Sequence, residues 1–178
     1  SGHVMRCLTL ADELSRQGAE SFFICRQHDG SLIEILQQRG YQVYTLPLEH
    51  DSGIESESKA TLAHADWLAS TQHRDAELSI SIVKAIQPDW LVVDHYALDE
   101  SWAKRLQPYC KKLMVIDDLA HRKHDCDILL DQNFGRDPQD YAAYVNEDCE
   151  LLCGSNYALL RPEFAEWRSY SLERRQHN

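Results

Sequence analysis

The chain has 178 residues, which is long enough to bury a proper core and corresponds to about one domain. Its 18 Lys and Arg against 29 Asp and Glu give a formal net charge of −11, so no basic surface is expected for nucleic acid or an anionic membrane. No stretch approaches the roughly 20 apolar residues of a membrane span, and we expect no signal peptide. These features predict a cytoplasmic protein, and they leave its oligomeric state open.

The six cysteines lie mostly in apolar patterns, without the spacing of a small disulfide-rich domain, so we expect reduced thiols. Two groups have spacings that could suggest a metal: Cys149-x-x-x-Cys153 and His121-x-x-His124-x-Cys126. On a strand, the first pair would stand about 13 Å apart, and the second group is more typical of a polar loop. We therefore expect neither a metal nor a cofactor.

An amphipathic helix is predicted at the start of the chain. Its apolar stripe recurs at three- and four-residue steps, at Val4, Cys7, Leu8, Ala11 and Leu14. Gly18 stands where a left-handed stop is expected. A glycine turn into a helix normally follows a strand in a parallel sheet, so we expect a first strand that this sequence does not contain.

His3 and Arg6 lie in the first turn of that helix. Unpaired N–H groups and partial positive charge there suit an anion and discourage protonation of a histidine. A neutral imidazole is what a general base needs. Arg6 opposes the dipole, which is easier to understand if an anionic ligand shares the site. The plainer alternative is a solvated helix end.

Further elements follow in chain order. The patterns predict a strand at 21–25, a helix at 31–39, a strand at 41–44, a surface loop at 49–59 and a helix at 76–86. Four apolar runs come next, at 90–93, 113–116, 127–130 and 151–153. Continuous apolar runs are typical of parallel strands covered on both faces. We therefore expect an α/β fold, with a Rossmann-like parallel sheet and helices on both faces.

Each of the four runs ends on polar residues, at 94–96, 117–118, 131–133 and 154–156. Ligands of open parallel sheets bind at the carboxyl ends of the strands, so these residues and His3 predict a sugar or sugar-nucleotide cleft. Tyr96 can stack on a sugar and hydrogen-bond through its hydroxyl. Strand-end Asp residues also cap helices, as expected of Asp99, and Asp117-Asp118 has two open interpretations, structural or ligand-orienting.

Five blocks in order resemble one family: residues 2–11, 93–99, 115–120, 126–133 and 157–164. The family is that of the sugar-nucleotide hydrolases of pseudaminic acid biosynthesis, which serves flagellin glycosylation and whose substrate is UDP-2,4-diacetamido-2,4,6-trideoxy-β-L-altropyranose. The resemblance implies a glycosyltransferase-B-like fold with two Rossmann-like halves, UDP being held mainly by the second. It also implies metal-independent hydrolysis with inversion, releasing UDP and the free sugar.

The resemblance places the general base at His3 and a sugar-pocket tyrosine at Tyr96. With the residues around them, the substrate-binding candidates are Gly2, Arg6, Asp94, Tyr96 and Asp117. We expect residues 1–162 to form the N-terminal domain without its first strand. Residues 163–178 are expected to form a polar linker helix toward a nucleotide-binding domain that the sequence does not contain. A glycosyltransferase of the same fold and a non-catalytic sugar-binding module are the alternatives.

Overall fold

A computed structural model describes residues 2–48 and 64–176. The helices in this part of the chain are α1 (Gly2–Arg16), α2 (Ile33–Gln38), α3 (Gln72–Ile86), α4 (Glu100–Leu106), α5 (Pro162–Glu166) and α6 (Arg168–Gln176). The strands are β1 (Phe22–Arg26), β2 (Gln42–Leu46), β3 (Trp90–Val93), β4 (Lys112–Ile116), β5 (Ile128–Asp131) and β6 (Glu150–Cys153). The predicted loop at 49–59 lies outside the described residues.

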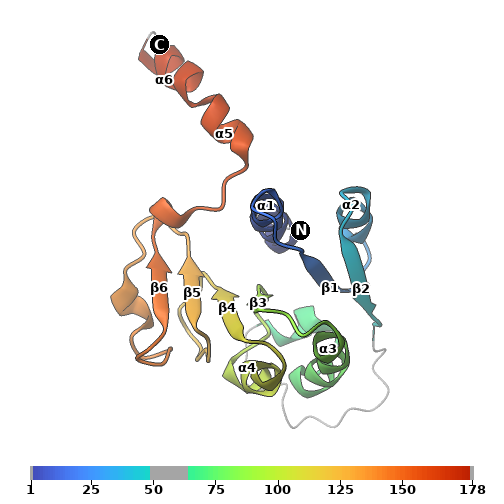
Figure 1. Cartoon of the computed structure of the whole chain (residues 1–178). Coiled ribbons are helices and arrows are strands. Elements are labelled where there is room, and N and C mark those ends of the chain that lie inside the picture. The colour runs from blue at the N-terminus through green and yellow to red at the C-terminus, as the bar shows by residue number, and fades with distance from the viewer. Residues whose placement is uncertain (1, 49–63, 177–178) are drawn as a thin grey trace.

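All the strand pairs among the described residues are parallel. One sheet has the order β3-β4-β5-β6, and β1 pairs with β2 in a second. Helices α3 and α4 pack together below the strands in Figure 1, whereas α1 and α2 lie on the other side. The predicted α/β, Rossmann-like parallel sheet is therefore confirmed. Each predicted strand has its counterpart, with ends that differ by at most two residues.

The main core lies between the four-stranded sheet and helices α3 and α4. Val93, Leu113, Val115 and Leu129 come from the sheet and pack against buried residues of both helices. Helix α3 begins four residues before the predicted start, because Thr71 caps it by accepting a hydrogen bond from the Arg74 amide. Asp99 caps α4 by accepting from the Ser101 amide at 2.8 Å, as predicted.

Helix α1 buries Leu8 and Ala11 of its predicted stripe, whereas Leu14 at its end is partly exposed. Gly18 follows with a φ of 90°, the left-handed conformation that glycine adopts at low cost. The helix begins at Gly2, near the carboxyl end of β3, and this places His3 at the predicted edge of the sheet.

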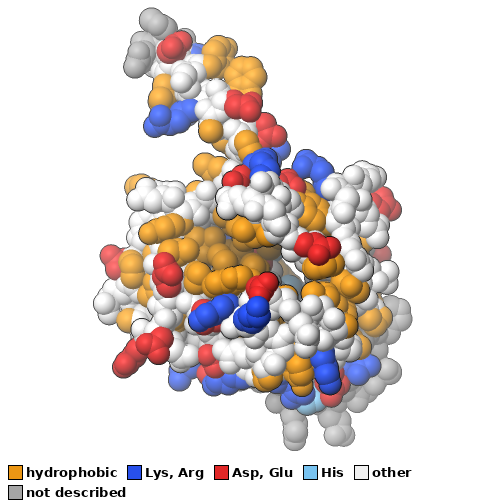
Figure 2. Space-filling model, viewed as in Figure 1, with side chains coloured by type: hydrophobic (Ala, Val, Ile, Leu, Met, Phe, Trp, Pro, Cys, Tyr) orange, Lys and Arg blue, Asp and Glu red, His pale blue; other side chains and the backbone are white. Residues whose placement is uncertain are grey.

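The facing edges of β1 and β3 are open. Among the described strands, β1 pairs only with β2 and β3 only with β4. Figure 1 shows a gap between the β1-β2 sheet and the four-stranded sheet that begins with β3. In Figure 2 hydrophobic side chains gather in a hollow at the middle of the face toward the viewer. An open edge of this kind is a template for one more strand.

The C-terminal helices α5 and α6 project away from the sheet (Figure 1). They carry exposed apolar side chains, among them Phe164, Trp167 and Tyr170. No helix in the described part of the chain is long and apolar enough to cross a membrane.

Candidate functional site

The start of α1 meets the end of β3 through His3 and Asp94. His3 Nδ1 lies 2.5 Å from Asp94 Oδ1 and 3.2 Å from the Asp94 carbonyl oxygen. The Asp94 side chain is only 3 % exposed. Burial by itself would raise the pKa of Asp94, but hydrogen bonds from Arg6 and His3 outweigh it and hold this pKa below its ordinary value.

An ionised Asp94 fixes the tautomer of His3. A carboxylate only accepts hydrogen bonds, so His3 Nδ1 must carry a proton, and in the neutral ring the lone pair is then on Nε2. A buried aspartate orients the histidine of a serine hydrolase triad by the same contact. The contact therefore orients the His3 ring through Nδ1.

Arg6 binds two carboxylates of the protein itself. It donates to both oxygens of Asp94, with Nη2 2.6 Å from Oδ1, and its Nη1 lies 3.2 Å from Asp118 Oδ2. Burial by itself would lower the pKa of Arg6, but the two carboxylates outweigh it and raise this pKa above its ordinary value. Arg6 thus lies as one cation between the two carboxylates of Asp94 and Asp118. The structure therefore gives Arg6 carboxylate partners within the protein, and an anionic ligand beside it stays a prediction.

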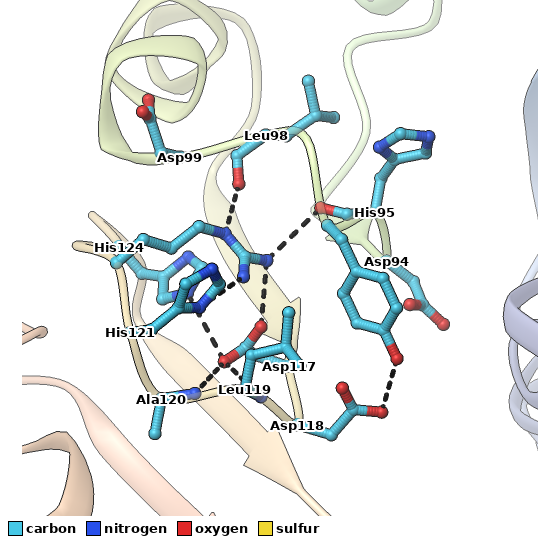
Figure 3. A network of polar contacts seen from close by, with 12 residues as sticks. Asp94, His95, Leu98, Asp99, Asp117, Asp118, Leu119, Ala120, His121 and His124 are labelled. Atoms are coloured by element: carbon cyan, nitrogen blue, oxygen red, sulfur yellow. Dashed lines mark hydrogen bonds and ion pairs between the residues drawn. The ribbon is translucent and has the colours of Figure 1, made fainter. Parts of the chain in front are cut away.

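Tyr96 joins this cluster from the loop after β3. Its hydroxyl donates to Asp118 Oδ2 at 2.8 Å (Figure 3). The rings of Tyr96 and His3 make an edge-to-face contact, with their centroids 4.5 Å apart. Burial and the neighbouring Asp118 carboxylate raise the pKa of Tyr96 to about 12, so the phenol is neutral at pH 7.

Asp117 lies behind the site and is fully buried. Its Oδ2 accepts from the amides of Leu119 and Ala120 at 3.2 and 3.0 Å and from the Tyr141 hydroxyl at 2.9 Å. Burial by itself would raise the pKa of Asp117, but the neighbouring His124, the charge of Arg122 and the Ala120 amide hold this pKa far below its ordinary value. Of the two interpretations left open by the sequence, the geometry favours the structural one for Asp117.

Arg122 fastens the two loops that carry Tyr96 and Asp118. Its Nη2 forms an ion pair with Asp117 Oδ1 at 2.9 Å, in the loop after β4. Its Nε donates to the Leu98 carbonyl at 2.9 Å, in the loop after β3 (Figure 3). The side chain is almost fully buried. Arg122 therefore links the loop that carries Tyr96 to the loop that carries Asp118.

His95, beside Tyr96, is a partly buried, neutral histidine. Its Nδ1 accepts a hydrogen bond from the Ala97 amide at 3.1 Å, which requires that this nitrogen be unprotonated. Burial is the main cause that lowers the pKa of His95 to about 4. His95 thus contributes to the shape of the loop after β3 and stays neutral at pH 7.

Of the sequence-based candidates, the structure brings His3, Arg6, Asp94 and Tyr96 together. Gly2 lies in the first turn of α1, and a Cβ added there would meet no described atom within 4 Å. The sequence left the role of Asp118 undecided and missed Arg122. Asp118 had a signal, since it follows a predicted strand, whereas a lone Arg122 in a polar loop has none.

Comparisons with known proteins agree with the resemblance. No family model matches the chain. A curated protein of Campylobacter jejuni, named UDP-2,4-diacetamido-2,4,6-trideoxy-β-L-altropyranose hydrolase, is 32% identical over 165 residues, which make up 92% of this chain and 48% of that protein. An uncharacterized protein of Methanocaldococcus jannaschii is 23% identical over 175 residues, or 97% of this chain and 31% of that protein. The chain thus spans less than half the length of either relative.

Proposed function

We propose that this chain carries the sugar site and the general base of a UDP-sugar hydrolase. Its substrate would be a UDP-linked 2,4-diacetamido-2,4,6-trideoxy sugar, as the name of the C. jejuni relative suggests. The observation that carries the proposal is the contact between His3 Nδ1 and the buried Asp94 carboxylate, because it leaves Nε2 of His3 free as a base.

In the proposed reaction His3 Nε2 takes a proton from water while the water oxygen bonds to the anomeric carbon. The bond from that carbon to the bridging oxygen breaks, and UDP leaves with this oxygen. Attack from the face opposite UDP inverts the anomeric configuration. Asp94 keeps the His3 ring in place and stabilises the imidazolium that forms.

The charge of the cluster supports attack at the sugar. A glycosyl transition state carries positive charge near the ring oxygen. Among the described residues that contact one another beside His3, two carboxylates, Asp94 and Asp118, face one guanidinium, Arg6. Fixed charges of this kind stabilise a developing opposite charge. The diphosphate of UDP would be held by other groups, in line with a nucleotide-binding half outside this chain.

The test is UDP release by the full protein when His3 is changed. Because His3→Gln keeps a polar side chain but no basic nitrogen, we expect kcat to fall at least a hundredfold. His73→Gln is the control, since His73 is an exposed histidine on α3, and its turnover should equal that of the wild type. Turnover of His3→Gln near the wild-type rate would remove His3 from the mechanism.

The same assay separates the alternative functions. A hydrolase releases UDP without any acceptor, a glycosyltransferase needs an acceptor for rapid release, and a binding module releases none.

A further inference from the structure

A row of aromatic rings runs outward from His3. The Tyr96 centroid lies 4.5 Å from that of His3, 5.3 Å from that of His64 and 5.8 Å from that of Trp67. His64 and Trp67 are themselves 4.6 Å apart. Through Tyr96, the candidate base His3 is therefore connected to two aromatic residues, His64 and Trp67, that the sequence did not suggest.

Trp67 is held in an exposed position by its neighbours. It belongs to the short 3₁₀ turn Ala65–Leu68, whose last residue, Leu68, is buried in the main core. Ala69 ends the turn with a φ of 48°. Trp67 nevertheless leaves 55 % of its surface exposed. The turn is thus anchored by Leu68 and presents the indole at the surface.

The rings leave aromatic surface available to a ligand. His64, Trp67 and Tyr96 are tilted to one another by 43° to 49°, so none is stacked face to face on another. An apolar surface bordered by polar groups is typical of a binding site. The polar groups here are His3, Arg6 and Asp118.

We propose that His64 and Trp67, with Tyr96, form an aromatic ledge that binds the methyl groups of the sugar. This inference rests on the proposed function. A 2,4-diacetamido-2,4,6-trideoxy sugar has an acetyl methyl on each amide and a methyl where most hexoses have a hydroxymethyl group. Such groups gain from contact with aromatic carbon, whereas a hydroxyl placed there loses its water without a partner. Trp67 is then a specificity-determining residue.

The sugar is the better occupant than the uracil base. In a UDP-sugar the ribose and two phosphates separate the base from the anomeric carbon, where His3 would act. Trp67 is linked to His3 through a single intervening ring, Tyr96. A ligand group on Trp67 is therefore close to the reacting carbon, as the sugar methyls are.

The test is binding of two free sugars to the full protein, measured by calorimetry: 2,4-diacetamido-2,4,6-trideoxyaltrose and N-acetylglucosamine. The wild type should prefer the trideoxy sugar by about tenfold, the scale for a hydroxyl in an apolar pocket. Trp67→Ala should weaken binding of the trideoxy sugar about tenfold and abolish the preference over N-acetylglucosamine. Trp67→Phe should keep most of the affinity and most of the preference. Trp90→Ala is the control, since Trp90 is partly exposed at the far end of β3, and it should bind like the wild type.

Unchanged binding in Trp67→Ala, or a wild type that binds neither sugar, would overturn the ledge. Weaker binding of UDP but not of the sugar in Trp67→Ala would also overturn it, because the indole would then hold the base. UDP-sugar hydrolysis is measured separately on the wild type. A wild type without hydrolysis but with ring-dependent sugar binding would refute the proposed function and leave the ledge standing.

Discussion

At the residue scale the site depends on Asp94, whose two oxygens have different neighbours. Oδ1 accepts from His3 and from Arg6 Nη2, and Oδ2 accepts from Arg6 Nε and from the Cys7 thiol at 3.6 Å. Each oxygen therefore faces a donor of Arg6. Only a carboxylate satisfies all of these donors at once.

Asp94→Asn tests this arrangement. The asparagine NH₂ group must replace one carboxylate oxygen. In one orientation it faces the Nε donor of Arg6, and in the other it donates to His3 Nδ1 and so moves the imidazole proton to Nε2. We expect kcat to fall at least a hundredfold with a smaller change in KM. Asp99→Asn, in the same loop, keeps a good helix cap and should retain activity. An active Asp94→Asn enzyme would show that the tautomer of His3 does not matter.

His95 predicts a pH dependence of stability. Its pKa is lowered from 6.5 to about 4 in the folded protein, so the unfolded chain binds more protons between these values. Its contribution is complete above pH 6.5 and is lost as the pH falls to 4, at a cost of about 3 kcal/mol. Urea unfolding of the wild type should show this slope, and His95→Asn should flatten it. An equal slope in both would assign the acid sensitivity to other groups.

At the scale of elements, the Arg122–Asp117 ion pair joins the loops after β3 and β4. Both side chains are buried, so removing one leaves the charge of the other without its partner. Tyr96 and Asp118 lie on these two loops and hydrogen-bond to each other. The pair is therefore expected to act on turnover through position, without touching substrate.

We expect Arg122→Gln and Asp117→Asn each to lower the free energy of unfolding by about 3 kcal/mol. The double variant should lose at least about 1 kcal/mol less than the sum of the two, because it leaves no unpaired charge. Urea unfolding of the three variants measures this coupling. Strictly additive losses would mean that the ion pair does not hold the loops together.

The same loops show where sequence patterns suffice and where they do not. Apolar runs predicted the four strands β3 to β6 and their parallel direction, because a buried parallel strand must be apolar on both faces. Polar residues after the strands predicted Asp94 and Tyr96 for the site. They could not distinguish a fully buried anchor such as Asp117 from a partly buried neighbour such as Asp118, because that depends on side-chain partners from distant segments.

The first turn of α1 shows another limit. The helix-end argument assigned Arg6 to an anionic ligand, since a cation opposes the dipole there. The structure supplies the anions from β3 and β4, as Asp94 and Asp118. Such a contact joins residues 88 or 112 positions apart. No local pattern in the sequence contains that information.

At the scale of the whole molecule, two features bear on the proposed domain organisation. The open edges of β1 and β3 face each other, and a parallel strand between them would run directly into α1. The exposed apolar side chains of α5 and α6 are suited to packing against another body. We propose that residues 1–162 complete a Rossmann-like domain with one further strand, and that 163–178 lead to a nucleotide-binding domain.

The central claim is that His3 directs water to the anomeric carbon, and turnover in ¹⁸O-water tests it most directly. The account predicts unlabelled UDP, because the bridging oxygen leaves with the nucleotide. It also predicts label and inverted configuration in the sugar, trapped by rapid reduction or read by NMR before the free anomers exchange. Label in UDP would mean attack at phosphorus and would contradict the account.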